Sequence, residues 1–151
     1  MPLPAAPFLL LCLDSLCLGS ACQAAPQQWT WVRNDLGMRF YLDRANLQPH
    51  GPLLHYWILV SFRYDPRLDG AKPYKSALLL RHADCATRTQ DTKSVLQYHA
   101  PMARGEPVWV QRFDDATLRM EPVGPGSVSA TMLDRACALA SQPHRLGSSR
   151  L

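Results

Sequence analysis

The segment that most constrains this chain is 74–85, YKSALLLRHADC, considered together with a second cysteine, Cys137, much further along the sequence. Successive residues of a strand point to opposite faces, and in the middle of this segment both sets of positions are apolar. Such a strand belongs in the interior of a sheet. We therefore predict an interior strand of an antiparallel sheet whose last residue, Cys85, delivers a thiol to the element that covers the sheet.

The covering element is predicted to be a helix near the C-terminus. After the turn sequence Gly-Pro-Gly, Ser127 is placed to cap a first helical turn. The apolar residues that follow recur at helical spacing, at Val128, Met132, Leu133, Ala136, Cys137 and Ala140. Cys137 lies on this stripe, so the helix should present it to the sheet.

The rest of the sheet is predicted from short segments rich in aromatic and β-branched residues, bounded by turn residues. With segment 74–85 they give about six strands, at 29–33, 38–42, 53–64, part of 87–99 and 108–113. The first two form a hairpin through the turn 34–37, with Met38, Phe40 and Leu42 pointing inward. The fold class is therefore α+β, an antiparallel sheet covered by a C-terminal helix.

The connections between these elements carry the remaining predictions. Asp43 should cap a single helical turn over 43–47, and Pro-rich 49–52 should form a turn. Segments 65–73 and 101–107 are expected to be loops, 117–120 a short edge segment, and 141–151 a loose tail. All four tryptophans fall in predicted strands, where they are more often core or sheet-face residues than a ligand cage.

Residues 1–24 resemble an export signal, with a short apolar core followed by small residues. The segment lacks the usual N-terminal positive charge, and Asp14 interrupts its apolar run. We expect cleavage near its end and a single domain over 27–140; lipidation of Cys22, which would anchor the protein to a membrane, is an alternative. Export predicts a location in the periplasm or at the outer membrane and cell surface.

Cysteine usage and charge agree with export. Three of the five cysteines lie in or beside the signal, which leaves Cys85 and Cys137 to form one disulfide; two buried free thiols are the alternative. The formal charge of +4 becomes +5 without the signal, whose one charged residue is Asp14, so anionic partners are favoured. The 16 Lys and Arg are scattered from Arg33 onward, without the basic stripe typical of nucleic-acid binding.

A search for catalytic chemistry finds no assembled site, and we predict no enzyme, no cofactor and no metal. Gly126 and Ser127 superficially match part of a nucleophile motif, but its second glycine is missing and helix capping explains the serine. The five histidines show no metal-ligand spacing. His82 and Asp84 share one strand face, and with a neighbouring strand they leave a metal site as an alternative.

The order of these parts resembles the bacterial surface-adhesin protein E family. The resemblance rests on a Trp-bearing first strand, Tyr41-Leu42-Asp43, the strand 56–60 (YWILV), a Lys-Ser pair before the strand that ends in Asp84-Cys85, a Y-x-x-P-M-x-x-G segment at 98–105, and Pro125-Gly126-Ser127 leading to Cys137. It covers residues 29–138. It implies an antiparallel sheet with a C-terminal helix pinned by a disulfide, and members that bind host extracellular-matrix and serum proteins.

The function expected from these observations is that of an exported, non-enzymatic binding module for host matrix proteins or anionic envelope components. A sheet face or edge would be available to the partner. The candidate basic contact residues are Arg63, Lys75, Arg81, Arg88 and Lys93. The alternative is a periplasmic structural or envelope-maintenance protein that self-associates through a sheet edge, without a host ligand.

Overall fold

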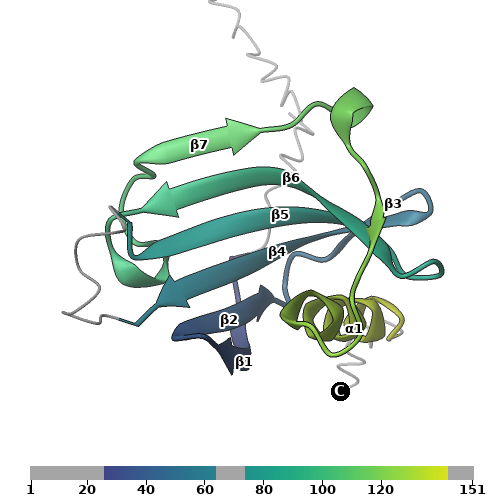
Figure 1. Ribbon diagram of the computed structural model, residues 1–151, viewed down its shortest axis with the longest axis horizontal. Coiled ribbons are helices and arrows are strands. Elements are labelled where there is room, and N and C mark those ends of the chain that lie inside the picture. Colours follow the sequence, from purple (N-terminus) through teal and green to yellow (C-terminus); the bar gives the residue numbers. More distant parts are fainter. Residues whose placement is uncertain (1–25, 64–73, 143–151) are drawn as a thin grey trace, which may run out of the picture.

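The computed structural model describes residues 26–63 and 74–142, and within them the chain forms one twisted antiparallel sheet and one α-helix (Figure 1). The strands are β1 (Trp29–Asp35), β2 (Met38–Asp43), β3 (Gln48–His50), β4 (Leu53–Phe62), β5 (Ser76–Asp84), β6 (Thr89–Tyr98), β7 (Trp109–Arg112) and β8 (Glu121–Pro122). Two 3-10 turns, η1 (Pro101–Ala103) and η2 (Asp115–Thr117), precede β7 and β8, and the helix is α1 (Val128–Ala140). The predicted α+β class is confirmed.

The main path of the sheet runs in the order β1-β2-β4-β5-β6-β7, and every neighbouring pair is antiparallel. The two shortest strands extend it, since β3 pairs with β4 and β8 pairs with β6. β5 lies between the two ten-residue strands β4 and β6, which confirms the predicted interior strand. β7 forms one end of the path and β1 the other (Figure 1).

α1 packs on one face of this sheet and closes the larger core. Ser127 begins the helix as predicted, because its Oγ accepts a hydrogen bond from the amide of Ala130 at 3.0 Å. Met132, Leu133 and Ala136 are buried against Tyr56 and other residues of β2, β4 and β5. Figure 1 shows the helix lying across the part of the sheet near β1, β2 and β4, away from β7.

The opposite face carries a second, smaller core. It contains Leu59, Leu78 and Tyr98, with Met102 and Ala103 of the η1 segment packed against them. Ser76 fixes this segment, since its hydroxyl donates to the carbonyl of Ala100 at 2.6 Å and accepts the amide of Ala103 at 2.9 Å. The η1 segment therefore covers part of the sheet face opposite the helix.

Three local predictions are wrong. Residues 43–47 form no helical turn: Asp43 ends β2 in a fully buried position, and its Oδ1 accepts the amides of Gln28 and Ala45, each at 3.0 Å. An aspartate that bonds to an amide two residues later stabilises a turn as readily as a helix start. Residues 48–50 pair with β4, so only 51–52 of the predicted turn 49–52 form a turn. The predicted edge segment 117–120 is not a strand, because β8 starts at Glu121.

The predicted export signal with Cys22, the loop 65–73 and the tail beyond Gln142 lie outside the described residues. Of the described hairpin, Leu36 and Gly37 form the turn with positive φ values, and Met38, Phe40 and Leu42 contact the helix-side core as predicted. A positive φ at both central positions matches the right-handed twist of the two strands.

Candidate functional site

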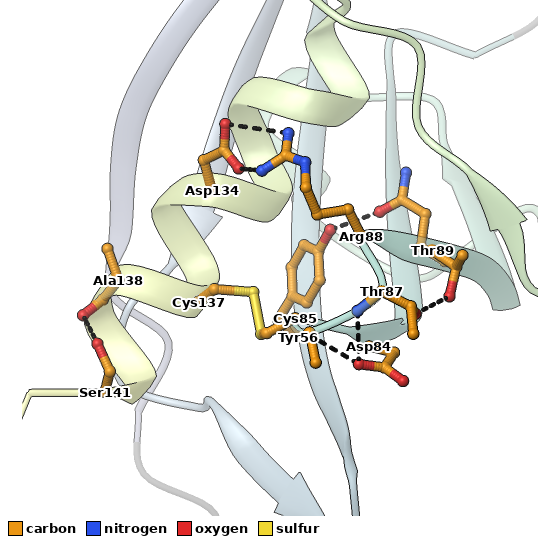
Figure 2. Close-up of a disulfide and its surroundings, with 12 residues drawn as sticks. Tyr56, Asp84, Cys85, Thr87, Arg88, Thr89, Asp134, Cys137, Ala138 and Ser141 are labelled. Atoms are coloured by element: carbon orange, nitrogen blue, oxygen red, sulfur yellow. Dashed lines mark hydrogen bonds and ion pairs between the residues drawn. A yellow bond between two sulfur atoms is a disulfide. The ribbon is translucent and has the colours of Figure 1, made fainter.

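The predicted disulfide is confirmed and links the end of β5 to the helix (Figure 2). Cys85 and Cys137 are 52 positions apart in sequence, and their Cα atoms are 5.8 Å apart. Cys137 packs against the helix-side core, as its place on the apolar stripe predicted. The bond closes a loop that contains β6, β7 and β8, so it holds α1 against strands that are formed by the intervening chain.

Polar contacts surround the disulfide and fix the turn between β5 and β6. Asp84 accepts the amides of Thr87 and Ala86 at 3.2 and 2.8 Å, and these bonds lower the pKa of its carboxyl. Arg88 forms an ion pair with Asp134 of the helix, as Figure 2 shows. Asp84 therefore stabilises the turn between β5 and β6, and the ion pair holds Arg88 of this turn against α1.

The five candidate basic residues do not form one surface. Arg63 and Lys75 are exposed and lie on adjacent strand ends, since the amide of Phe62 donates to the carbonyl of Lys75 at 2.9 Å. Arg88 and Lys93 are ion-paired, with Asp134 and Asp115 respectively. Arg81 is half-buried on the helix side of β5 and donates to Thr92. Only Arg63 and Lys75 are therefore brought together at the surface.

The longest run of exposed large apolar residues in the described part of the chain consists of the residue before β7 and the first two residues of β7. Val108, Trp109 and Val110 are 45%, 44% and 41% exposed, although they are consecutive and large. The sequence analysis missed this, because a strand next to a loop and a strand inside the sheet have the same composition. A contiguous exposed apolar segment on a strand is uncommon, and it marks an interaction surface or an aggregation hazard.

The backbone of β7 is open along its outer edge among the described residues. Val108 donates its amide to Gln97 of β6 at 2.7 Å. Phe113 also donates its amide to the carbonyl of Lys93 of β6, at 2.9 Å. Because backbone groups alternate in direction along an antiparallel strand, Trp109 and Gln111 direct theirs toward β6, whereas Val110 and Arg112 direct theirs away from it. No charged residue interrupts 107–111. β7 therefore offers both unpaired backbone groups and apolar side chains.

The edge at the other end of the sheet is less accessible to a partner. A bulge interrupts the pairing of β1 with β2 between Trp31 and Arg33. Arg33 also donates to the carbonyl of Gly126 at 3.0 Å, which ties this strand to the start of the helix. Bulges and inward-held charges are the devices by which proteins protect sheet edges. The two edges thus differ: β1 also carries an exposed apolar residue, Trp31, but it is interrupted by a bulge and tied to the start of the helix, whereas β7 pairs with β6 without a register shift.

Three histidines stack on the face opposite the helix. The ring centroids of His50 and His55 are 4.8 Å apart, and those of His55 and His82 are 3.7 Å apart. Burial and the neighbouring His82 lower the pKa of His55 to about 4, and burial also lowers the pKa of His82. The rings of His55 and His82 are therefore neutral at pH 7.

This stack does not supply a metal centre. In the part of the chain that the structure describes, no group of three or more His, Cys, Asp or Glu side chains is arranged to hold a metal ion. His82 stacks on His55, whereas the carboxylate of Asp84 accepts amides of the turn that follows β5. The two side chains therefore make separate contacts and do not form a shared metal site. The Nε2 atoms of His55 and His82 are buried without a hydrogen-bond partner among the described residues.

Comparisons with known proteins identify the family of this chain. Neither a search of curated proteins nor a search of solved structures gives a significant match. No helix among residues 26–63 and 74–142 has the length and apolar character needed to cross a membrane. The family model described as surface-adhesin protein E matches residues 29–138, and the chain therefore belongs to the surface-adhesin protein E family.

Proposed function

We propose that this protein is an exported, non-enzymatic binding module of the bacterial envelope that binds an extended segment of a host matrix protein along the open edge of β7. The observation that carries the proposal is the exposed run Val108, Trp109 and Val110, which leads into the outermost strand β7 and forms its start. Membership of a surface-adhesin family supports export and binding. The disulfide between Cys85 and Cys137 is in keeping with an oxidising compartment.

An added strand is the mode of binding that fits this edge. Main-chain hydrogen bonds from Val110 and Arg112 would supply affinity, and side chains on alternate positions would supply specificity. Trp109 is paired with Gln97 and Val110 with Leu96, so the two apolar side chains project on opposite faces of the sheet. A partner strand could therefore contact Trp109 on one face of the sheet and Val110 on the other, with the tryptophan as the larger apolar contact.

The exposed basic end of the sheet extends the proposed contact surface. Arg63 follows β4, Lys75 precedes β5, and the amide of Lys75 donates to the carbonyl of Tyr98 at 2.8 Å. Tyr98 ends β6, next to the residues that pair with the start of β7. Charges at this place would steer an acidic segment toward the β7 edge and make association sensitive to salt.

The experiment measures binding of the mature protein to immobilised laminin, fibronectin and collagen by surface plasmon resonance. Val110→Lys places a charge in the middle of the edge, and Arg112→Pro removes an outward amide without removing a bond to β6. We expect each change to weaken binding about tenfold or more. Leu36→Lys is the matched control, because Leu36 is 88% exposed in the β1–β2 turn and far from β7 in the strand order.

Equal binding by the wild type and both edge variants would contradict the proposal. The double variant Arg63→Glu, Lys75→Glu tests the basic end separately, and its effect should shrink as salt is raised. Sedimentation velocity of the same proteins tests the alternative function. Concentration-dependent self-association that Val110→Lys abolishes, without binding to any of the three matrix proteins, would assign the edge to a second copy of this chain.

A further inference from the structure

A polar groove lies on the helix side of the sheet, beside the helix and separate from the β7 edge. Its volume is about 720 Å³, within the range of about 300–1,000 Å³ that is usual for small-molecule sites. The floor is the part of β5 and β6 that α1 leaves uncovered, and the walls are the β7–β8 connection and the first turn of the helix. The groove is therefore built from segments that the sequence separates widely.

Arg81 is the central group of the floor. Its guanidinium donates to the hydroxyl of Thr92, while its Nε is buried without a hydrogen-bond partner among the described residues. Burial lowers the pKa of this guanidinium, and the charge of Asp91 acts in the opposite direction. No ion pair joins Arg81 to a carboxylate in residues 26–63 and 74–142. A half-buried cation without a bound anion is costly, so a ligand carboxylate would stabilise it.

A bulge places Arg81 at this position. The register of β5 and β6 shifts between Leu80 and Arg81, so that Leu80 pairs with Ser94 but Arg81 pairs with Thr92. Bulges redirect side chains and are common beside functional sites. Arg81 and Thr92 thus face each other on the groove floor.

The remaining lining is mostly polar, with one aromatic ring and two small apolar residues, Pro122 and Val123. Ser127 and Ser129 of the helix start, together with Gln90, supply hydroxyl and amide groups, and Phe113 supplies an apolar face. Asp91 is fixed in the wall, because its two oxygens accept the amides of Thr92 and Arg119 at 2.6 and 2.5 Å. The groove therefore offers one buried cation, several hydroxyl partners, carboxylate acceptors and one ring.

We infer that this groove binds an acidic sugar residue, with the sugar carboxylate on Arg81 and the sugar hydroxyls on the surrounding polar groups. A planar carboxylate matches the fork of the guanidinium. Hydroxyl groups donate to carboxylates such as Asp91 and Glu121, and the C–H face of a sugar ring packs on an aromatic ring such as Phe113.

The charges of the groove separate this ligand class from phosphate monoesters. Arg81 and Arg119 are the two cations of the lining, and Asp91 and Glu121 are the two anions. A dianionic phosphate would meet both carboxylates at close range, whereas a monoanion with neutral hydroxyls uses the same carboxylates as acceptors. The balance of charge therefore favours a carboxylate on an otherwise neutral, hydroxylated body.

The test uses the mature protein labelled with ¹⁵N and two probes, a glucuronic-acid-terminated disaccharide and the matched glucose-terminated disaccharide. Amide shifts are followed during titration. We expect the acidic disaccharide to shift amides of Gln90, Thr92 and Ser129, and to bind about tenfold or more tightly than the neutral one. Binding of both probes with equal strength, shifts confined to other regions, or no shifts at millimolar probe would each overturn the inference.

Variants identify the groups responsible. Arg81→Lys keeps the charge but loses the planar fork, and it should weaken binding of the acidic probe about tenfold. Arg39→Lys, the same change at an exposed position of β2, should have no effect. Phe113→Leu leaves Arg81 in place and is the second test variant if the Arg81 variant does not fold. It should weaken the binding of both disaccharides. Unchanged binding in the folded groove variants would overturn the inference, and the β7 proposal does not depend on this result.

Discussion

Removal of the disulfide should cost this protein a large part of its stability. The bond between Cys85 and Cys137 spans 52 positions. In the chain-entropy model, a cross-link over that length lowers the entropy of the unfolded chain by about 14 cal/mol/K, which is about 4 kcal/mol at 25 °C. Domains of this size are stable by about 5–15 kcal/mol in total, so the variant should be close to its folding limit.

The double variant Cys85→Ala, Cys137→Ala isolates this effect. Alanine is apolar and small, so the half-buried position on α1 stays apolar. Urea unfolding followed by tryptophan fluorescence and far-UV circular dichroism should show a loss of about 4 kcal/mol, and the thermal midpoint should fall by about 15 °C. The slope of the free energy of unfolding against urea should rise, because an unlinked chain exposes more surface when it unfolds.

The control for this variant is the wild-type protein measured with and without a reductant. Reduction should give the same loss as the double substitution, because both leave the unfolded chain without its cross-link. A loss below about 1 kcal/mol, with an unchanged slope, would show that the unfolded chain is not restrained as the model requires, and would refute the reasoning.

Two further changes test local features of the fold. Ser127→Ala removes the side-chain oxygen that accepts the amide of Ala130, and it should lower the free energy of unfolding by about 1 kcal/mol; Ser141→Ala at the other end of the helix is the control, and an equal loss in both would contradict a specific cap. His55→Phe keeps a ring in the histidine stack but removes its titration. Since the pKa of His55 is lowered from 6.5 to about 4, the unfolded chain binds a proton in this range that the folded chain excludes, so stability falls as the pH falls from about 6.5 to about 4. Solvent screening of a partly exposed ring reduces the effect to about 1–2 kcal/mol. Urea unfolding at pH 4.5 and pH 7.5 should show a smaller pH dependence in His55→Phe than in the wild type or in His99→Asn, and an unchanged dependence would contradict the assignment.

Several features of the fold followed directly from the residues. The double-sided apolar character of segment 74–85 predicted an interior strand, and β5 lies inside the sheet because only such a strand buries both of its faces. The helical spacing from Val128 to Ala140 predicted α1 together with its cap at Ser127. Cys137 on that stripe and Cys85 at the strand end were predicted to form a disulfide, with two free thiols as the alternative, and the disulfide is present.

Other features were outside the reach of local patterns. Asp43 has the composition of a helix cap, yet its burial beside Gln28 makes it the centre of a turn. The charge of a basic residue is visible in the sequence, whereas its partner is not, so the ion pairs of Arg88 and Lys93 were not anticipated. The same applies to the stacking of His55 on His82, which depends on the register of β4 and β5.

The sequence by itself determined the α+β class, the C-terminal helix and the interior strand, and the order of its motifs indicated the family. The helix and the strands depend on residues that are near one another in the chain or share one period, and such patterns survive without knowledge of the fold. The sequence also paired Cys85 with Cys137, with free thiols as the alternative, and the structure decided for the bond. Only the tertiary structure decided that Val108, Trp109 and Val110 lie on an open edge and that Arg81 lies in a groove. Which side chains are exposed, and which come together in a groove, depends on which strands are neighbours in the sheet. That strand order is set by contacts between residues that are distant in the sequence.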